Sequence, residues 1–77
     1  MENIDVIAYI DKNGDIRPMK VRLQENEELI VFKINRLIHA NKGKFENTYK
    51  CEVIINDIVR VLTLIYNLNT TKWYIKK

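Results

Sequence analysis

The fold class follows from residues 3–14, which have the sequence NIDVIAYIDKNG. Apolar and polar side chains alternate here with a period of two, so that Ile4, Val6, Ala8 and Ile10 share one face and Asn3, Asp5 and Tyr9 the other. That period is typical of a strand buried on one side, because a helix repeats about every 3.6 residues. Asn13-Gly14 is the strongest short hairpin signal, since both central residues of a type I′ turn need positive φ.

A turn at Asn13-Gly14 predicts the register of the first hairpin. It places Ile4 opposite Leu23, Val6 opposite Val21, Ala8 opposite Met19, and Ile10 opposite Arg17. On the other face, Asp5 falls opposite Arg22 and forms an oppositely charged cross-strand pair. Pro18 cannot donate a ladder hydrogen bond, so the sequence predicts an open edge or a bulge at this position.

The alternation continues after an acidic turn over residues 24–28. In residues 29–40, one face is expected to hold Ile30, Phe32, Ile34, Arg36 and Ile38, and the other Leu29, Val31, Lys33 and Leu37. The glutamates favour a helix somewhere in residues 24–37, but the density of Ile and Val and the flanking turns make a strand the better prediction.

Two further strands follow the loop at residues 41–44. Their apolar phase begins with Tyr49, Cys51, Val53 and Ile55. A two-residue turn at Asn56-Asp57 places Ile55 opposite Ile58, Cys51 opposite Leu62 and Tyr49 opposite Leu64. Trp73 in the last segment is expected in the core, because burying so large a ring contributes more than leaving it wet.

These patterns predict one all-β domain over residues 1–77: a small antiparallel meander of about six strands curled into a barrel, Src-homology-3-like or Sm-like. Barrel closure removes exposed sheet edges, which is why we prefer it to an open sheet that pairs with another copy.

The length and composition of the chain exclude several kinds of site and of protein. A chain of 77 residues buries only about 60% of its unfolded surface, so it depends on good packing or on self-association. Cys51 is the single cysteine and His39 the single histidine, which excludes an internal disulfide and a structural zinc site, and no cofactor is expected. We expect a cytoplasmic protein without membrane contact, because residues 1–10 do not resemble a signal peptide and no apolar run is long enough to cross a bilayer.

No catalytic set emerges, so the sequence does not predict an enzyme. Cys51 and His39 are the nearest approach to a nucleophile and its base, but Cys51 lies in the apolar phase of its strand and should be a buried, inert thiol. Glu25, Glu27 and Glu28 cluster in a turn, where like charges remain hydrated.

A net charge of +3 leaves two kinds of binding module open. Nucleic acid would be held by cations and stacked on aromatic rings, for which the candidates are Arg17, Lys20, Lys33, Arg36, Lys42 and Lys44 with Tyr9 and Tyr74. A protein partner, a second copy included, suits the proline-interrupted strand, the exposed tyrosines and the small core. We rank the protein partner ahead of nucleic acid.

The order of motifs resembles a family of short all-β proteins of clostridia and related bacteria. The matching segments are Asp11 to Pro18 in the first hairpin, Val31 to Ile34, Tyr49 to Cys51, and Trp73 to Lys76 at the end. The family pattern favours Asn-Gly at the second two-residue turn, where this chain has Asn56-Asp57. The resemblance implies a small bacterial β-barrel and no catalytic residues.

Overall fold

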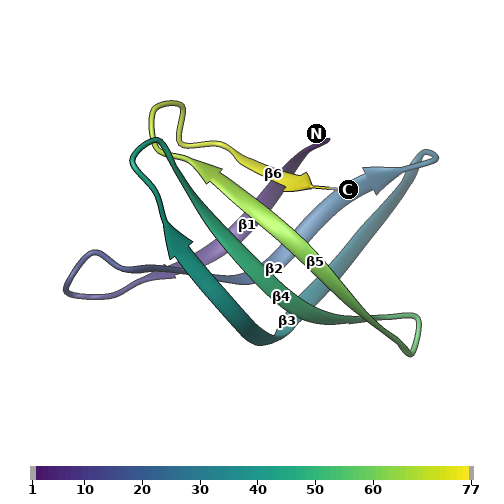
Figure 1. Ribbon diagram of the computed structural model, residues 1–77. Coiled ribbons are helices and arrows are strands. Elements are labelled where there is room, and N and C mark those ends of the chain that lie inside the picture. Colours follow the sequence, from purple (N-terminus) through teal and green to yellow (C-terminus); the bar gives the residue numbers. More distant parts are fainter. Residues whose placement is uncertain (1, 77) are drawn as a thin grey trace.

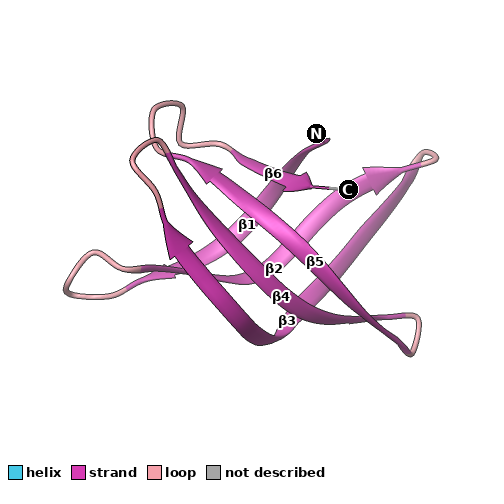
Figure 2. Ribbon diagram, in the orientation of Figure 1, coloured by secondary structure: helices cyan, strands magenta, loops and turns pink. Residues whose placement is uncertain are grey.

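Six strands joined by short turns make up the described part of the chain in the computed structural model, and Figure 2 shows only strands and loops. The structure describes residues 2–76, with β1 at Glu2–Ile10, β2 at Ile16–Glu25, β3 at Glu28–Lys42, β4 at Glu46–Ile55, β5 at Ile58–Asn67 and β6 at Trp73–Lys76. Met1 and Lys77, which the prediction of one domain includes, lie outside these residues. No helix in the described chain is long and apolar enough to cross a membrane.

The strands pair in chain order, and pairing of β1 with β6 closes the sheet into a barrel. The short β6 pairs with β1 from Glu2 opposite Ile75 to Ile4 opposite Trp73, and with β5 from Thr63 to Tyr66. Figure 1 shows the strands crossing one another steeply, with the β2–β3 and β4–β5 turns projecting to one side and the β1–β2 turn to the other. The predicted all-β meander and its closure into a small barrel are confirmed.

The first hairpin follows the predicted register away from its turn and departs from it near the turn. Asp5 lies opposite Arg22 and Val6 opposite Val21, as predicted. Between Ile7 and Ala8 the register shifts by one residue, so that Ala8 lies opposite Pro18 and Ile10 opposite Ile16. Met19 is the extra residue, and the bulge predicted at Pro18 is present one position later.

The turn of this hairpin explains the shift. Asn13 does not have the positive φ of a type I′ turn, and Gly14 alone has it in this turn, at 84°. The Gly14 N–H donates to the Asp11 carbonyl and the Asp11 N–H to the Asp15 carbonyl, both at 3.0 Å. This is a three-residue loop with a glycine bulge, so the type I′ prediction is wrong here. The Asp11 carboxylate stabilises it by accepting hydrogen bonds from the Asn13 and Asp15 N–H groups.

The third strand is extended throughout, and no helix forms in residues 24–37. Its turn with β2 consists of Asn26 and Glu27, both at positive φ. Against β4 the register shifts twice, at Asn35 and at Ile38. The bulges reverse the side-chain phase, so the prediction that Arg36 and Ile38 share the inner face with Phe32 is wrong and Leu37 takes the inner position. β3 bends sharply at its middle, as bulges require (Figure 1).

The β4–β5 hairpin matches its predicted register in full. Asn56 and Asp57 have φ values of 52° and 64°, which define a two-residue type I′ turn. Ile55 lies opposite Ile58, Cys51 opposite Leu62, and Tyr49 opposite Leu64.

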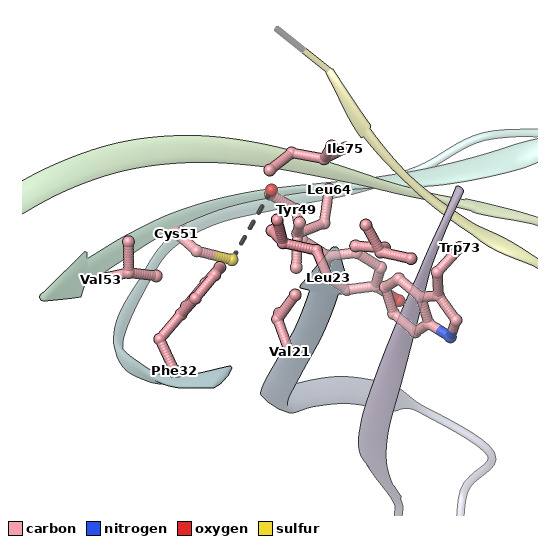
Figure 3. Packing of buried hydrophobic residues seen from close by; sticks show 10 residues of the cluster. Val21, Leu23, Phe32, Tyr49, Cys51, Val53, Leu64, Trp73 and Ile75 are labelled. Carbon is pink, nitrogen blue, oxygen red and sulfur yellow. Dashed lines mark hydrogen bonds between the residues drawn. The ribbon is translucent and has the colours of Figure 1, made fainter. Parts of the chain in front are cut away.

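The core lies inside the barrel and is built from the inner phase of all six strands. Figure 3 shows Trp73 beside Tyr49, with Leu64, Val21 and Cys51 filling the interior. Trp73 is only 8% exposed, so its prediction as a core residue is confirmed. Core side chains therefore occupy the interior of the described barrel, and candidate binding residues lie on its outer face and at its ends.

Candidate functional site

The thiol of Cys51 lies in the interior of the barrel, and its surroundings make it inert. It is fully buried, and burial raises its pKa to about 11. Its Sγ lies 3.7 Å from the Tyr49 carbonyl oxygen (Figure 3). His39 is exposed on β3 and lies opposite Lys50, whereas Cys51 faces Leu37. The two side chains are thus on opposite sides of the sheet and cannot act as nucleophile and base.

Among the predicted cations, the structure brings Lys20 and Lys33 together. They are direct cross-strand neighbours on β2 and β3, and neither belongs to an ion pair among the described side chains. Like charges directly opposite each other destabilise a sheet. An anionic group bound at this position would relieve that repulsion.

Three other cations are already paired with acids. Arg22 donates from Nη2 to Asp5 at 2.7 Å, as its predicted register implied. Arg36 binds Glu52 at 3.3 Å, and that carboxylate also accepts from Asn35 at 2.8 Å. These two contacts lower the pKa of Glu52. Lys42 pairs with Asp15. Arg36 and Lys42, two of the predicted site residues, therefore have their charges compensated within the chain.

The remaining predicted site residues are spread over the molecule. Tyr9 and Arg17 are cross-strand neighbours near the β1–β2 turn, and the Tyr9 side chain is 61% exposed. Lys44 lies in the β3–β4 loop with its Nζ 5.6 Å from the centre of the Phe45 ring. Tyr74 is half-buried on β6 opposite Ile65. The predicted set does not form a single basic face.

The pair Lys20–Lys33 lies instead within a mixed apolar and basic surface on the outside of β1, β2 and β3. We call this surface the hairpin face, and its members are Ile7, Lys20, Arg22, Leu29, Val31 and Lys33. Their register rows are Ile7 with Lys20 and Lys33, and Arg22 with Val31 and with Asp5, its ion-pair partner. A groove of about 450 Å³ runs along it.

Three apolar side chains of the hairpin face were not among the predicted site residues. Ile7 and Leu29 are each 65% exposed and Val31 is 47% exposed, so together they leave an apolar patch open to water. The sequence carried a signal for two of them, because the alternation already placed Leu29 and Val31 with Lys33 on the face opposite Phe32. What it could not show was whether another part of the chain covers that face.

A second exposed apolar group lies on the outside of β4 and β5. Ile54 and Val59 are cross-strand partners, and Val61 is the partner of Glu52. All three apolar side chains are exposed. On this surface Arg36 and Glu52 form an ion pair with each other.

Comparison with protein-family models, curated proteins and solved structures finds no match for this chain. The resemblance to the clostridial family therefore stays a prediction.

Proposed function

We propose that this barrel is a non-enzymatic binding module and that its hairpin face pairs with the same face of a second copy. The observation that carries the proposal is the order of side chains along the β2–β3 hairpin. Its turn carries Glu27 beside Glu28, its middle exposes Leu29 and Val31, and its base holds Lys20 and Lys33. Acidic, apolar and basic zones thus follow one another along one exposed face.

This order is complementary to itself when two copies pack antiparallel about a twofold axis. With the axis near Ile30, Glu27 and Lys33 lie three residues to either side of it. Each is then roughly 10 Å from the axis along the strand, so Glu27 of one copy meets Lys33 of the other. Leu29 of one copy meets Val31 of the other by the same symmetry. The apolar patch is covered and the lysine repulsion is relieved in one arrangement.

The test is sedimentation of the full chain over a range of concentrations, with charge-reversal variants. We expect a dimer for the unchanged chain and a weakening of about tenfold or more for either Lys33→Glu or Glu27→Lys, because each contact occurs twice in a twofold dimer. The double variant Lys33→Glu/Glu27→Lys should restore association, since the opposite charges meet again. Val59→Glu on the other apolar surface is the matched control and should leave the mass unchanged.

A chain that remains monomeric at every concentration would overturn the proposal. So would a dimer that responds to Val59→Glu and ignores both charge reversals, because the interface would then lie on β4 and β5.

Nucleic acid is the second candidate, favoured by the lysine pair and by Tyr9 beside Arg17. Fluorescent single-stranded DNA and RNA, titrated at low salt and at about 150 mM salt, test it. Binding that persists at the higher salt and is lost in an Arg17/Lys33/Arg36→Ala variant would support this function. Glu27→Lys separates the two candidates, because it should weaken self-association but strengthen nucleic-acid binding by adding a cation.

A further inference from the structure

The β2–β3 and β4–β5 hairpins project to the same side of the barrel (Figure 1). Residues of both hairpins line a cavity of about 460 Å³. Its volume falls within the roughly 300–1,000 Å³ of small-molecule sites. Apolar side chains from three parts of the chain line it: Leu23, Ile30 and Phe32 from β2 and β3, Ile55 and Leu62 from β4 and β5, and Ile75 from β6. The hairpin face lies on the outside of the sheet, so this is a separate site.

Arg60 is the unexpected member of the lining. It occupies an inner register position of β5, opposite the fully buried Val53 and two residues before Leu62. The Arg60 side chain is exposed and brings a permanent positive charge to the edge of this partly apolar cavity. Of the ion pairs formed by the described side chains, none involves Arg60. Its guanidinium donors are therefore available to a ligand.

The polar groups at the rim restrict the charge of that ligand. Glu25 and Asn56 line the same cavity as Arg60. Arg60 is the one cation among these lining residues, so a ligand with a single carboxylate matches the one positive charge that the cavity offers. Guanidinium and carboxylate groups fit each other through two parallel hydrogen bonds.

We infer that the cavity is a binding site for an aliphatic monocarboxylate, whose chain lies against the apolar walls and whose carboxylate accepts hydrogen bonds from Arg60. The inference does not depend on self-association, since neither Glu27 nor Lys33 lines the cavity.

The probe is decanoate, titrated into the full chain while backbone amide resonances are followed by NMR. We expect saturable shifts concentrated at Ile55, Leu62 and Ile75. Affinity should rise by about fourfold for each methylene from hexanoate to decanoate, since each added group leaves water. Decanol, which has the same chain without the charge, should bind at least tenfold more weakly.

Variants at the rim test the role of the charge. Arg60→Gln should lower decanoate affinity about tenfold or more and leave decanol binding unchanged, and Arg60→Lys should retain part of the affinity. Glu25→Gln should raise decanoate affinity, because a repelling charge is removed. Arg17 is an exposed arginine near the β1–β2 turn, so Arg17→Gln is the matched control and should leave decanoate affinity unchanged.

Three results would overturn the inference: no saturable shifts with decanoate, equal binding of decanoate and decanol, or unchanged affinity in Arg60→Gln. Glu27→Lys, which should weaken self-association, is expected to bind decanoate as the unchanged chain does, at a protein concentration where this variant is monomeric. A loss of binding in that variant would mean that the site forms between two copies and not within one barrel.

Discussion

At the scale of single residues, Trp73 contributes more to the barrel than its position near the chain end suggests. Its ring centre lies 5.5 Å from that of Tyr49 on β4 and 4.8 Å from that of Tyr66 on β5. Aromatic pairs at such separations stabilise a core beyond the area they bury. The indole therefore attaches the four-residue β6 to its neighbour β5 and, through the core, to β4.

Replacing Trp73 by alanine should lower the free energy of unfolding by about 3–5 kcal/mol, because a large ring is lost and a cavity is left. That loss is comparable with the whole stability of a domain of this size, roughly 5 kcal/mol. Urea unfolding followed by circular dichroism measures it, with Trp73→Phe as the milder control. An unchanged unfolding midpoint in Trp73→Ala would show that the ring is not part of the core.

Cys51 should make stability fall in alkaline solution. Burial raises the pKa of its thiol from an ordinary 9.0 to about 11, so the folded state holds a proton that the unfolded chain releases first. This contribution is fully present below pH 9 and is lost as the pH rises towards 11. Burial also raises the pKa of Tyr49, which acts in the same direction.

Thermal unfolding of the unchanged chain and of Cys51→Ala, compared between pH 8 and 11, isolates the contribution of the thiol to the pH dependence of stability. We expect the unfolding temperature of the unchanged chain to fall more steeply over this range. Parallel curves for the two proteins would contradict a raised thiol pKa.

At the scale of the elements, the turns decide how each pair of strands is aligned. Asn26-Glu27 and Asn56-Asp57 are two-residue turns in which every central residue has positive φ. The first hairpin uses a longer loop in which Gly14 alone has positive φ. The register of this hairpin shifts at Met19 as a result. An Asn-Gly sequence is thus compatible with two turn geometries, and the Asp11 side chain favours the longer one.

Asp57→Gly should stabilise the β4–β5 hairpin by roughly 0.5–1 kcal/mol. Asp57 has a φ of 64°, which costs an L-residue energy that glycine avoids. Asn13→Gly is the matched control, because Asn13 does not have positive φ and glycine there only adds freedom to the unfolded chain. Urea unfolding of both variants checks the difference. Equal effects would mean that the backbone strain at Asp57 is negligible.

At the scale of the whole molecule, the barrel depends on a closure between its two chain ends. β6 pairs with β1 on one side and with β5 on the other, and Ile75 lies opposite both Glu2 and Leu64. Figure 1 shows the N and C labels near each other at this seam. Removing β6 would expose the edges of β1 and β5 and uncover the core.

Deletion of residues 73–77 should therefore abolish cooperative unfolding. A circular permutant that joins residue 77 to residue 1 by a short Gly-Ser linker and opens the chain at Asn69-Thr70 is the matched control. It also breaks the β5–β6 turn but keeps every strand, so it should fold. Near-ultraviolet circular dichroism during heating distinguishes the two. A folded deletion variant would show that closure by β6 is dispensable.

Much of the fold could be predicted because strand alternation and short turns are local properties. Residues 46–67 are the clearest example, since one turn type and one apolar phase fix the whole β4–β5 register. The bulges at Asn35 and Ile38 could not be predicted, because they arise where β3 bends from one neighbouring strand to the other. They moved Leu37 inward and left Arg36 to pair with Glu52.

The candidate sites, like the fold, depend partly on local sequence patterns and partly on contacts between strands distant in sequence. The sequence by itself determined the six-strand meander, the buried thiol and tryptophan, and the alternation that sets Lys33 beside Leu29 and Val31. The sequence also predicted the pair of Arg22 with Asp5. Tertiary structure alone decided that Arg36 and Lys42 are paired with acids, which apolar face stays uncovered, and that Arg60 reaches the edge of a cavity. The physical reason is that alternation fixes the side of a sheet on which a residue lies, whereas exposure and charge pairing depend on strands distant in sequence.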